Sequence, residues 1–229
     1  MKLSIIVPVF NEQGTLTEIL DRLLNLSLDW EKEIVVVDDG STDGSRQLLK
    51  EFAAKKADPR LKFFFHPQNM GKGKAIRTAL EQLTGDVVII QDADLEYDPG
   101  EYQFLLAPFQ KEETKVVYGS RFLKENKNIY RRYLWGNKLL TWLTNLLYRT
   151  KITDSYTCYK IFRAAVIKGL NLESNGFEVE AEITVKLGRK KIPIQEAPIA
   201  YNPRKLEEGK KIGWRDAAKG IYTILKYRF

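Results

Sequence analysis

The chain has 229 residues, of which 44% are hydrophobic and 29% charged. This composition is typical of a folded globular protein with one large core or two small ones, and it excludes a disordered tail. No apolar run approaches the ~20 residues that a transmembrane helix needs. The formal net charge of +7 predicts an anionic partner, which could be nucleic acid, phosphate or an acidic membrane surface.

The redox setting is indicated by the single cysteine and by the first residues. Cys158 cannot form an internal disulfide, and the sequence from Met1 runs straight into strand-like residues without a signal-peptide pattern. We therefore expect a protein of the reducing cytoplasm.

The first half of the chain alternates apolar strands with amphipathic helices. We predict strands over residues 3–10, 33–40, 61–67, 86–94 and 115–122, and helices over residues 15–26, 44–56 and 72–83. Strands that are apolar throughout and alternate with helices favour a mostly parallel sheet covered on both faces. The predicted fold class is therefore α/β, doubly wound and Rossmann-like, in which ligands bind beyond the carboxyl ends of the strands.

Polar side chains follow each of these five predicted strands. They are Asn11 and Glu12, Asp38 and Asp39, Asn69 to Lys72, Asp92 and Asp94, and Arg121. We expect all of them to face one crevice. Asp39 is interpreted as a nucleotide contact, because an Asp at a strand end can accept hydrogen bonds from ribose hydroxyls. Ser41 and Asp43 are interpreted as caps of the following helix.

The glycine pattern argues against two common phosphate-binding motifs. The first strand is followed by NEQGTL, which has one glycine where a dinucleotide-binding turn has G-x-G-x-x-G, so a nicotinamide cofactor is not expected. The segment NMGKGKA at residues 69–75 lacks the spacing of a P-loop. It is either an anion-tolerant helix start or a helix-opening turn, and the pattern leaves both open.

The segment GDVVIIQDADLEYDP, residues 85–99, places four carboxylates directly after a buried strand. Taken alone, it could be a solvated turn. However, Asp92 and Asp94 are two residues apart in an extended segment and therefore point the same way. Two such carboxylates suit a hard divalent cation, Mg²⁺ or Mn²⁺, that is also bound by substrate phosphates.

The second half contains two aromatic and basic helices, predicted over residues 129–151 and 212–229. Apolar residues recur at spacings of three and four in the first of them: Trp135, Leu139, Leu140, Trp142, Leu143, Leu146 and Leu147. This pattern fits a buried helix and an amphipathic membrane-interface helix equally well. No repeat or linker divides the chain, so a single domain over residues 1–229 is expected.

Six segments occur in an order that resembles a known family: SIIVPVFNE, VVVDDGSTDGS, GKGKAIRTAL, DADLEYDP, YGSRF and EAPIAYNPR with EGKKI. Together they are similar to the inverting GT-A glycosyltransferases, in the branch of dolichyl-phosphate mannosyltransferase and the polyprenyl-phosphate glycosyltransferases. The resemblance is strongest over residues 3–122. It implies a GT-A fold with a nucleotide-sugar-binding half, residues 1–122, and an acceptor and membrane-interface half, residues 123–229. It also implies a peripheral enzyme on the cytoplasmic face of a membrane.

The resemblance implies a role for particular residues. The nucleotide sugar would be bound by Pro8, Phe10, Glu12, Asp39 and Asp92, and the Mg²⁺ or Mn²⁺ ion by Asp92 and Asp94. The catalytic residues would be Asp94, Arg121 and Arg204. The phosphate- and acceptor-binding residues would be Arg131, Arg132, Asp154, Thr157 and Lys211.

Three further positions depart from the family or have no implied role. The segment of residues 154–162 has Cys158 and Lys160 where the family has glycine and arginine. Asp154 and Thr157, from this segment, would lie near the donor sugar. The role of Glu96 stays open between an extra metal ligand and a surface acid.

The acceptor can be argued from acid–base chemistry. A lipid monophosphate is already anionic and needs no general base, whereas a sugar hydroxyl does. The basic residues after the fifth strand therefore favour a phosphate acceptor. The resemblance implies that this acceptor is a polyprenyl or dolichyl phosphate, and that mannose or glucose is transferred to it with inversion from GDP-mannose or UDP-glucose.

Two alternatives to this reaction are kept. A hydroxyl acceptor would require a base such as Glu178 or Glu182, although an acidic helix surface is the preferred interpretation of Glu178, Glu180 and Glu182. A nucleic-acid-binding module would use the basic surface, but it would leave Asp92 and Asp94 without a role.

Overall fold

Seven strands form one mixed sheet in the computed structural model, which describes the backbone of residues 1–126, 131–204 and 214–228, and their side chains except those of residues 131–134 and 214. The strands are β1 (Lys2–Val9), β2 (Glu31–Asp38), β3 (Leu61–Phe65), β4 (Val87–Ile90), β5 (Val116–Ser120), β6 (Lys160–Arg163) and β7 (Gln195–Pro198). Their order across the sheet is β3-β2-β1-β4-β6-β5-β7.

The first four strands confirm the predicted α/β class. β1 pairs in parallel with both β2 and β4, and β2 pairs in parallel with β3. The central positions of these strands, such as Ile5, Val35 and Ile89, are fully buried, as expected when helices cover both faces of a parallel sheet. The carboxyl ends of all four strands therefore reach the same edge of the sheet.

The other side of the sheet contains antiparallel pairs within the mostly parallel sheet that was predicted. β6 runs antiparallel to β4 and to β5, while β7 is parallel to β5. Neither β6 nor β7 was predicted as a strand. β6 is only four residues long and starts with the charged but fully buried Lys160. The sequence therefore has no apolar run at this position that would indicate a strand.

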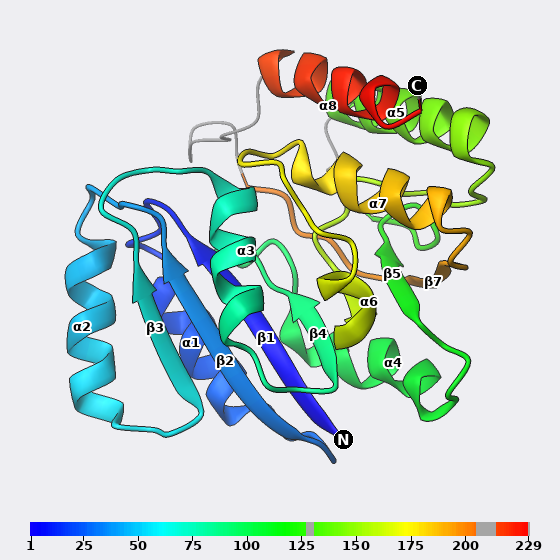
Figure 1. Ribbon diagram of the computed structural model, residues 1–229. Helices are drawn as coiled ribbons and strands as arrows, with labels where there is room; N and C mark the ends of the chain where they lie inside the picture. Colours follow the sequence, from blue (N-terminus) through cyan, green and yellow to red (C-terminus); the bar gives the residue numbers. More distant parts are fainter. Residues whose placement is uncertain (127–130, 205–213, 229) are drawn as a thin grey trace.

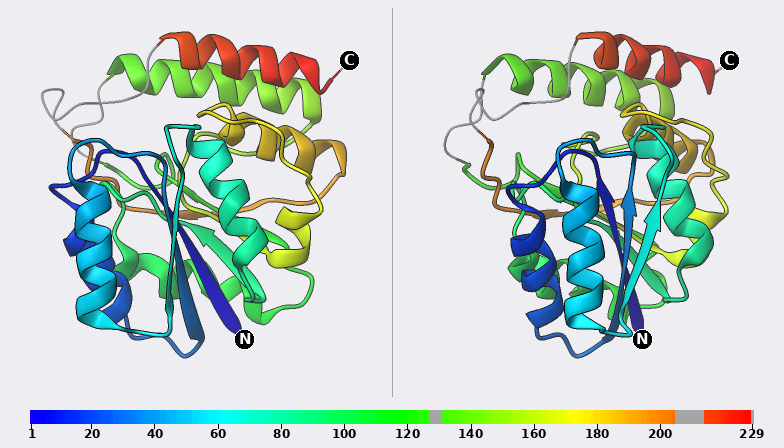
Figure 2. Two further views of the ribbon diagram at one scale, coloured as in Figure 1. Left: turned by 60° about the vertical axis from the view of Figure 1, so that its left-hand side comes forward. Right: turned by 90° about the vertical axis from the view of Figure 1, so that its left-hand side faces the viewer.

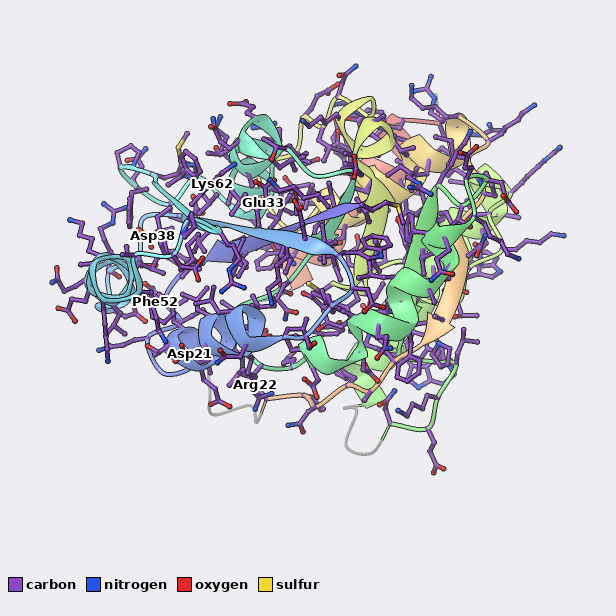
Figure 3. The ribbon with its side chains drawn as sticks, turned by 90° about the horizontal axis from the view of Figure 1, so that it is seen from below. Asp21, Arg22, Glu33, Asp38, Phe52 and Lys62 are labelled. Atoms are coloured by element: carbon purple, nitrogen blue, oxygen red, sulfur yellow. The ribbon has the colours of Figure 1, made fainter. Side chains whose placement is uncertain are left out.

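Two layers of helices cover the sheet. The three helices predicted in the first half are confirmed as α1 (Leu16–Asn25), α2 (Ser45–Lys56) and α3 (Lys72–Gln82). Two shorter helices follow, α4 (Tyr102–Leu106) and α6 (Ala164–Lys168). The 3₁₀ turns η1 (Pro99–Glu101) and η2 (Ala107–Gln110) flank α4. Seen from below, α1 and α4 lie on one face of the sheet and α3 and α6 on the other (Figures 1 and 3). This arrangement is the doubly wound packing expected from the sequence.

Three helices of the second half lie beyond the carboxyl ends of the first strands: α5 (Arg131–Tyr148), α7 (Val179–Arg189) and α8 (Trp214–Lys226). α5 and α8 lie side by side across the end of the molecule opposite the amino terminus, above α7 (Figures 1 and 2). Leu140, Tyr148, Val185 and Ile224 join the three helices in a small core of their own. No helix within the described residues is long and apolar enough to cross a bilayer.

Candidate active site

A cavity of about 1270 Å³ lies at the carboxyl ends of the strands, between the sheet and the layer of α5, α7 and α8. One wall is lined by Pro8 of β1 and by residues that follow the strands, with Arg204 beside them: Phe10, Glu12, Asp39, Asp92, Asp94, Glu96 and Arg121. The opposite wall includes Asn137 and Leu140 of α5, Glu178 and Glu180 at α7, and Asp216 and Lys219 of α8. The prediction that the strand ends face one crevice is confirmed for most of these residues, but Asn11 and Asp38 are not among the described residues that line the cavity, since Asp38 is fully buried and pairs with Arg46.

Arg204 bridges two of the predicted carboxylates. Its Nη2 lies 2.8 Å from both carboxylate oxygens of Glu12, which follows β1. The same nitrogen lies 3.1 Å from Oδ2 of Asp94, which follows β4. One cationic group thus contacts three carboxylate oxygens at the carboxyl ends of the neighbouring strands β1 and β4.

Asp92 is held by a second cation in a chain of alternating charges. Lys72 Nζ, at the start of α3, lies 2.8 Å from Oδ1 of Asp92 and 3.0 Å from Oε1 of Glu180. The other oxygen of Glu180 forms an ion pair with Lys160, whose Nζ also donates to the carbonyl of Thr157 at 2.6 Å. Lys160 is therefore a fully buried cation with two oxygen acceptors, which is the condition under which a buried charge is tolerated.

The alternating charges of Asp92, Lys72 and Glu180 stabilise one another. Burial alone would raise the pKa of Asp92, but the Lys72 ammonium outweighs it and holds the pKa below its ordinary value. Burial would lower the pKa of Lys72, but Asp92 and Glu180 hold it well above its ordinary value. Burial, together with the charge of Asp92, raises the pKa of the neighbouring Cys158 thiol, so this thiol is kept protonated.

Asp39 lines the cavity and also fixes part of its wall. Its Oδ1 accepts hydrogen bonds from the backbone N–H of Met70 at 2.9 Å, and its Oδ2 accepts one from Gly71 at 2.7 Å. His66 Nδ1 lies 2.7 Å from Oδ1, and its Nε2 contacts Thr78 at 2.9 Å. A nucleotide contact at Asp39 would use the lone pairs that remain on this carboxylate.

The amino end of α3 is covered by the loop that precedes α7. The carbonyl of Asn175 accepts a hydrogen bond from the N–H of Lys74 at 3.1 Å. A Cβ placed on Gly71 would lie 2.3 Å from that carbonyl oxygen, and one on Gly73 would lie 2.3 Å from the carbonyl of Ser174. The glycines thus allow a close approach of two backbones, which favours the helix-opening turn over the anion-tolerant helix start.

Arg121 lines the cavity because Asp154 holds it there. Nε and Nη2 of Arg121 donate to the two oxygens of Asp154 at 2.7 and 2.8 Å, a bidentate pair. Burial would lower the pKa of Arg121, but the charge of Asp154 holds it above its ordinary value. Asp154 and Thr157 are fully buried and, among the described residues, do not belong to the cavity lining. The structure therefore gives Asp154 the role of positioning Arg121.

Glu96 lies in the turn that follows β4, residues 91–98, here called the acidic turn, and it binds the segment of residues 201–204. Its carboxylate accepts hydrogen bonds from the Tyr201 hydroxyl at 2.8 Å and from the N–H of Arg204 at 3.0 Å. Its carbonyl accepts a third from the N–H of Asn202 at 3.0 Å. These bonds place the Arg204 side chain against Glu12 and Asp94, and they assign Glu96 to a role that the sequence left open.

The three acids of the α7 region differ in position. Glu180 and Glu182 are buried, so the expected acidic helix surface is wrong for both. Glu182 accepts hydrogen bonds from the N–H groups of Glu173 and Ser174 at 2.8 Å each, which fixes the loop before α7. Glu178 lines the cavity, and its Oε2 has no hydrogen-bond partner among the described residues.

Three predicted phosphate-binding residues cannot be placed at the site. The side chains of Arg131 and Arg132, at the start of α5, and the whole of Lys211 lie outside the described residues. Within the part of the chain that is described, no group of three or more His, Cys, Asp or Glu side chains is arranged to hold a metal ion. The acids at the strand ends are instead interleaved with Lys72 and Arg204.

Comparison with known proteins shows to which family this chain belongs. Residues 4–170, more than half of the chain, match the family described as "Glycosyl transferase family 2". The chain belongs to glycosyl transferase family 2. The resemblance read from the six segments is thereby confirmed at the level of the family, and the acidic residues after β4 fall within the matched part of this glycosyltransferase.

Several curated proteins are similar over most of the chain. A dolichol-phosphate mannosyltransferase from Pyrococcus furiosus is 28% identical over 99% of this chain and 64% of its own length. The low-salt glycan biosynthesis hexosyltransferase Agl6 from Haloferax volcanii is 29% identical over 99% of this chain and 55% of its own length. A UDP-N-acetylglucosamine–dolichyl-phosphate N-acetylglucosaminyltransferase from Methanococcus voltae is 28% identical over 85% of this chain and 83% of its own length. The chain thus spans less than two thirds of the first two relatives.

The fold is shared with solved glycosyltransferase structures. Glucosyl-3-phosphoglycerate synthase from Mycobacterium tuberculosis, crystallised with Mn²⁺, UDP and glucosyl-3-phosphoglycerate, superposes with a TM-score of 0.74 at 20% identity. The match covers 99% of this chain and 80% of the synthase. The predicted GT-A fold is confirmed by this likeness, and the sheet that carries it is mixed.

Proposed function

We propose that this glycosyltransferase moves a hexose, mannose or glucose, from a nucleotide diphosphate sugar to a polyprenyl or dolichyl phosphate, with inversion at the sugar carbon. One observation carries the proposal. The cavity places the carboxylates of Glu12, Asp92 and Asp94 against cationic side chains, with Arg121 on the same wall. Anionic groups for a metal and cationic groups for phosphates therefore occur together. The names of the Pyrococcus and Methanococcus relatives, which include dolichol or dolichyl phosphate, support the same acceptor class.

The carboxylates at the strand ends fit a divalent cation. Cationic groups already lie on them, since Arg204 Nη2 contacts Asp94 at 3.1 Å and Lys72 Nζ contacts Asp92 at 2.8 Å. Oxygen donors of this kind suit Mg²⁺ or Mn²⁺ held by one or two carboxylates and by substrate phosphates. Asp92 and Asp94 would hold the ion, which would neutralise the donor diphosphate and stabilise it as a leaving group.

The chain's own residues supply binding and orientation. In the nucleotide-sugar half, residues 1–122, the donor nucleotide lies against Pro8, Phe10, Glu12 and Asp39. Arg121 and Arg204 bring the acceptor phosphate close to the donor and offset the repulsion between two anionic substrates. Because the acceptor oxygen is already anionic, it attacks in line without a general base.

The acceptor and membrane-interface half, residues 123–229, would contact the lipid. Both α5 and α8 contribute residues to the cavity, and both expose large apolar side chains: Trp135, Leu139, Trp142 and Leu146 on α5, and Ile221, Tyr222 and Leu225 on α8. Trp and Tyr favour the interfacial region of a bilayer. A peripheral contact of these two helices with the cytoplasmic face of a membrane would deliver a lipid phosphate directly to the cavity.

A hydroxyl acceptor is a second candidate because of Glu178. This residue lines the cavity, and its Oε2 has no hydrogen-bond partner among the described residues, whereas Glu182 is committed to the loop before α7. Glu178 is thus the carboxylate that could serve as the base for a sugar or polysaccharide hydroxyl. Glu178→Gln would abolish transfer in that case and would leave transfer to a lipid phosphate active.

The test is transfer of radiolabelled sugar from GDP-mannose and from UDP-glucose into an organic-extractable polyprenyl phosphate. The reactions are run with Mg²⁺, with Mn²⁺ and with chelator. Metal-dependent label in the lipid phase is the expected result, and the donor that gives it identifies the sugar. Consumption of the donor without a labelled lipid would reject the lipid phosphate as the acceptor and would direct the search to hydroxyl acceptors.

A further inference from the structure

The Arg204 guanidinium occupies the position in which a cation is expected. Its Nη2 lies 2.8 Å from each oxygen of Glu12 and 3.1 Å from Oδ2 of Asp94. The three side chains are largely shielded from solvent, with exposed fractions of 16%, 10% and 18%. At such distances, and with little water between the groups, a charge-assisted contact is considerably stronger than one on an open surface.

A divalent cation at Asp94 and this guanidinium are in direct competition. Both carry positive charge, and both require the oxygens of Asp94. The guanidinium and the cation would repel each other strongly if they lay a few ångströms apart in a partly buried site. Binding of the cation therefore requires the guanidinium to leave Asp94. The protein must give up the Arg204 contact each time the cation binds.

The backbone of Arg204 can stay in place while its side chain moves. The N–H of Arg204 and the hydroxyl of Tyr201 donate to the two oxygens of Glu96 at 3.0 and 2.8 Å. The N–H of Asn202 donates to the Glu96 carbonyl at 3.0 Å. These three bonds do not involve the guanidinium, so its release leaves the segment anchored next to the acidic turn and still at the edge of the cavity.

We propose that Arg204 is the resident counter-ion of the cation site, that the divalent cation displaces it, and that the displaced guanidinium then binds the acceptor phosphate. This inference rests on the proposed function, because it assumes the cation at Asp94. It implies an order of binding in which the cation and the nucleotide sugar precede the acceptor. Arg204 would be held on protein carboxylates until the cation is in place.

The experiment measures the affinity of the protein for Mn²⁺ in the absence of nucleotide. The electron paramagnetic resonance signal of free Mn²⁺ reports how much of the ion remains unbound. The wild type is compared with Arg204→Met and with Lys219→Met, which removes a positive charge from the lining of the same cavity. Arg204→Met should bind Mn²⁺ roughly 10- to 100-fold more tightly, the range expected when a competing charge-assisted contact is lost. Lys219→Met should change the affinity only about twofold, as for one screened charge.

A second variant and a second readout guard against a misfolded protein. Arg204→Lys retains the positive charge but loses the planar fork, so its Mn²⁺ affinity should lie between those of the wild type and Arg204→Met. In transfer assays, Arg204→Met should raise the KM for polyprenyl phosphate more than the KM for the nucleotide sugar. A variant that binds the metal more tightly but uses the acceptor poorly is not explained by unfolding.

The outcomes separate this inference from the proposed function. If Asp94→Asn leaves Mn²⁺ binding unchanged, the metal assignment of the proposed function is wrong. If Asp94→Asn weakens binding and the three forms at position 204 bind Mn²⁺ equally, the cation site stands and the displacement of Arg204 is rejected.

Discussion

Both ends of the sheet hold shielded carboxylates, and the partners of these carboxylates differ. At the amino end, Glu33 of β2 accepts hydrogen bonds from Ser4 at 2.6 Å, from the N–H of Thr84 at 2.6 Å and from Lys62 at 2.8 Å. Figure 3 shows Glu33 and Lys62 close together on this side of the molecule. At the carboxyl end, Glu12, Asp92 and Asp94 contact the charged ends of Arg204 and Lys72.

The difference separates a structural carboxylate from one that can exchange its partner. The Thr84 N–H belongs to the backbone of the loop before β4, so its bond to Glu33 cannot be given up without moving the chain. The cationic groups of Arg204 and Lys72 lie at the tips of flexible side chains, so the proposed metal ion would be able to replace them without a change of fold. Both groups of acids are electrostatically satisfied, and those at the carboxyl end also line the cavity described above.

The largest expected effect comes from removing a charge at the carboxyl end. Asp94→Asn should reduce sugar transfer by roughly 10²–10³-fold, the usual loss when one group that stabilises developing charge is removed. The free energy of unfolding should fall by only about 1 kcal/mol although the ion pair with Arg204 is lost, because Arg204 keeps its two contacts with Glu12 and the amide oxygen can still accept from the N–H of Glu96, now 3.1 Å from Oδ1. Steady-state kinetics and urea unfolding of the same preparation measure the two effects. Full activity in Asp94→Asn would contradict the assignment of this residue.

The same chemical change at the amino end should have the opposite result. Glu33→Gln removes the charge to which Lys2 and Lys62 are paired, at 3.3 and 2.8 Å, and it disturbs the bonds from Ser4 and Thr84. We expect a loss of about 2–3 kcal/mol in the free energy of unfolding, because buried hydrogen bonds to a charged group are lost. The kcat of the folded variant should match that of the wild type. A large fall in kcat without a fall in stability would place Glu33 in the catalytic machinery.

Acid should weaken the protein through Glu33 in a defined pH window. Burial alone would raise the pKa of Glu33, but the bonds from Lys62, Ser4 and Thr84 outweigh it and lower the pKa to about 2 from an ordinary value of 4.5. A carboxyl whose pKa is depressed by folding stabilises the protein above its unfolded pKa, and this contribution is lost as the pH falls towards the folded pKa. The difference in unfolding free energy between wild type and Glu33→Gln should therefore shrink between pH 4.5 and pH 2. Urea titrations across this window measure it; a constant difference would reject the assigned pKa shift.

The sequence was sufficient to predict at which edge of the sheet the cavity lies. Apolar strands followed by polar residues predicted the strands β1 to β5, and the parallel arrangement of the first four brought Glu12, Asp39 and Asp94 to one edge. These predictions use only local patterns and the rule that ligands bind at the carboxyl ends of such strands. The predicted α1, α2 and α3 also hold to within two residues at each end.

The partners of the site residues could not be predicted in the same way. Arg204 and Glu12 are 192 residues apart, and Arg121 and Asp154 are 33 apart. Nothing in a local pattern indicates that a particular arginine will meet a particular acid. The buried positions of Glu180 and Lys160 were missed for the same reason, since each appears in the sequence as a charge suited to the surface until its partner is known.

The comparison of the two ends extends to the exposed aromatic residues. Trp142 on α5 and Phe104 on α4 are 58% and 75% exposed. α5 contributes residues to the cavity lining, whereas α4 lies towards the opposite end of the molecule (Figure 1). If α5 contacts the membrane, Trp142→Ser should weaken binding to vesicles of phosphatidylcholine and phosphatidylglycerol by about fivefold to tenfold, which is the contribution of one partly buried aromatic ring.

Phe104→Ser is the matched control, because it removes an even more exposed ring from the other end of the molecule. Its vesicle binding should equal that of the wild type in a sedimentation assay at fixed lipid concentration. Equal binding by all three proteins would show that the α5 surface does not contact the lipid. Weakened binding by Phe104→Ser alone would place the membrane contact at the amino end of the sheet, away from the cavity, and a lipid phosphate could not then reach Arg121 from the bound surface.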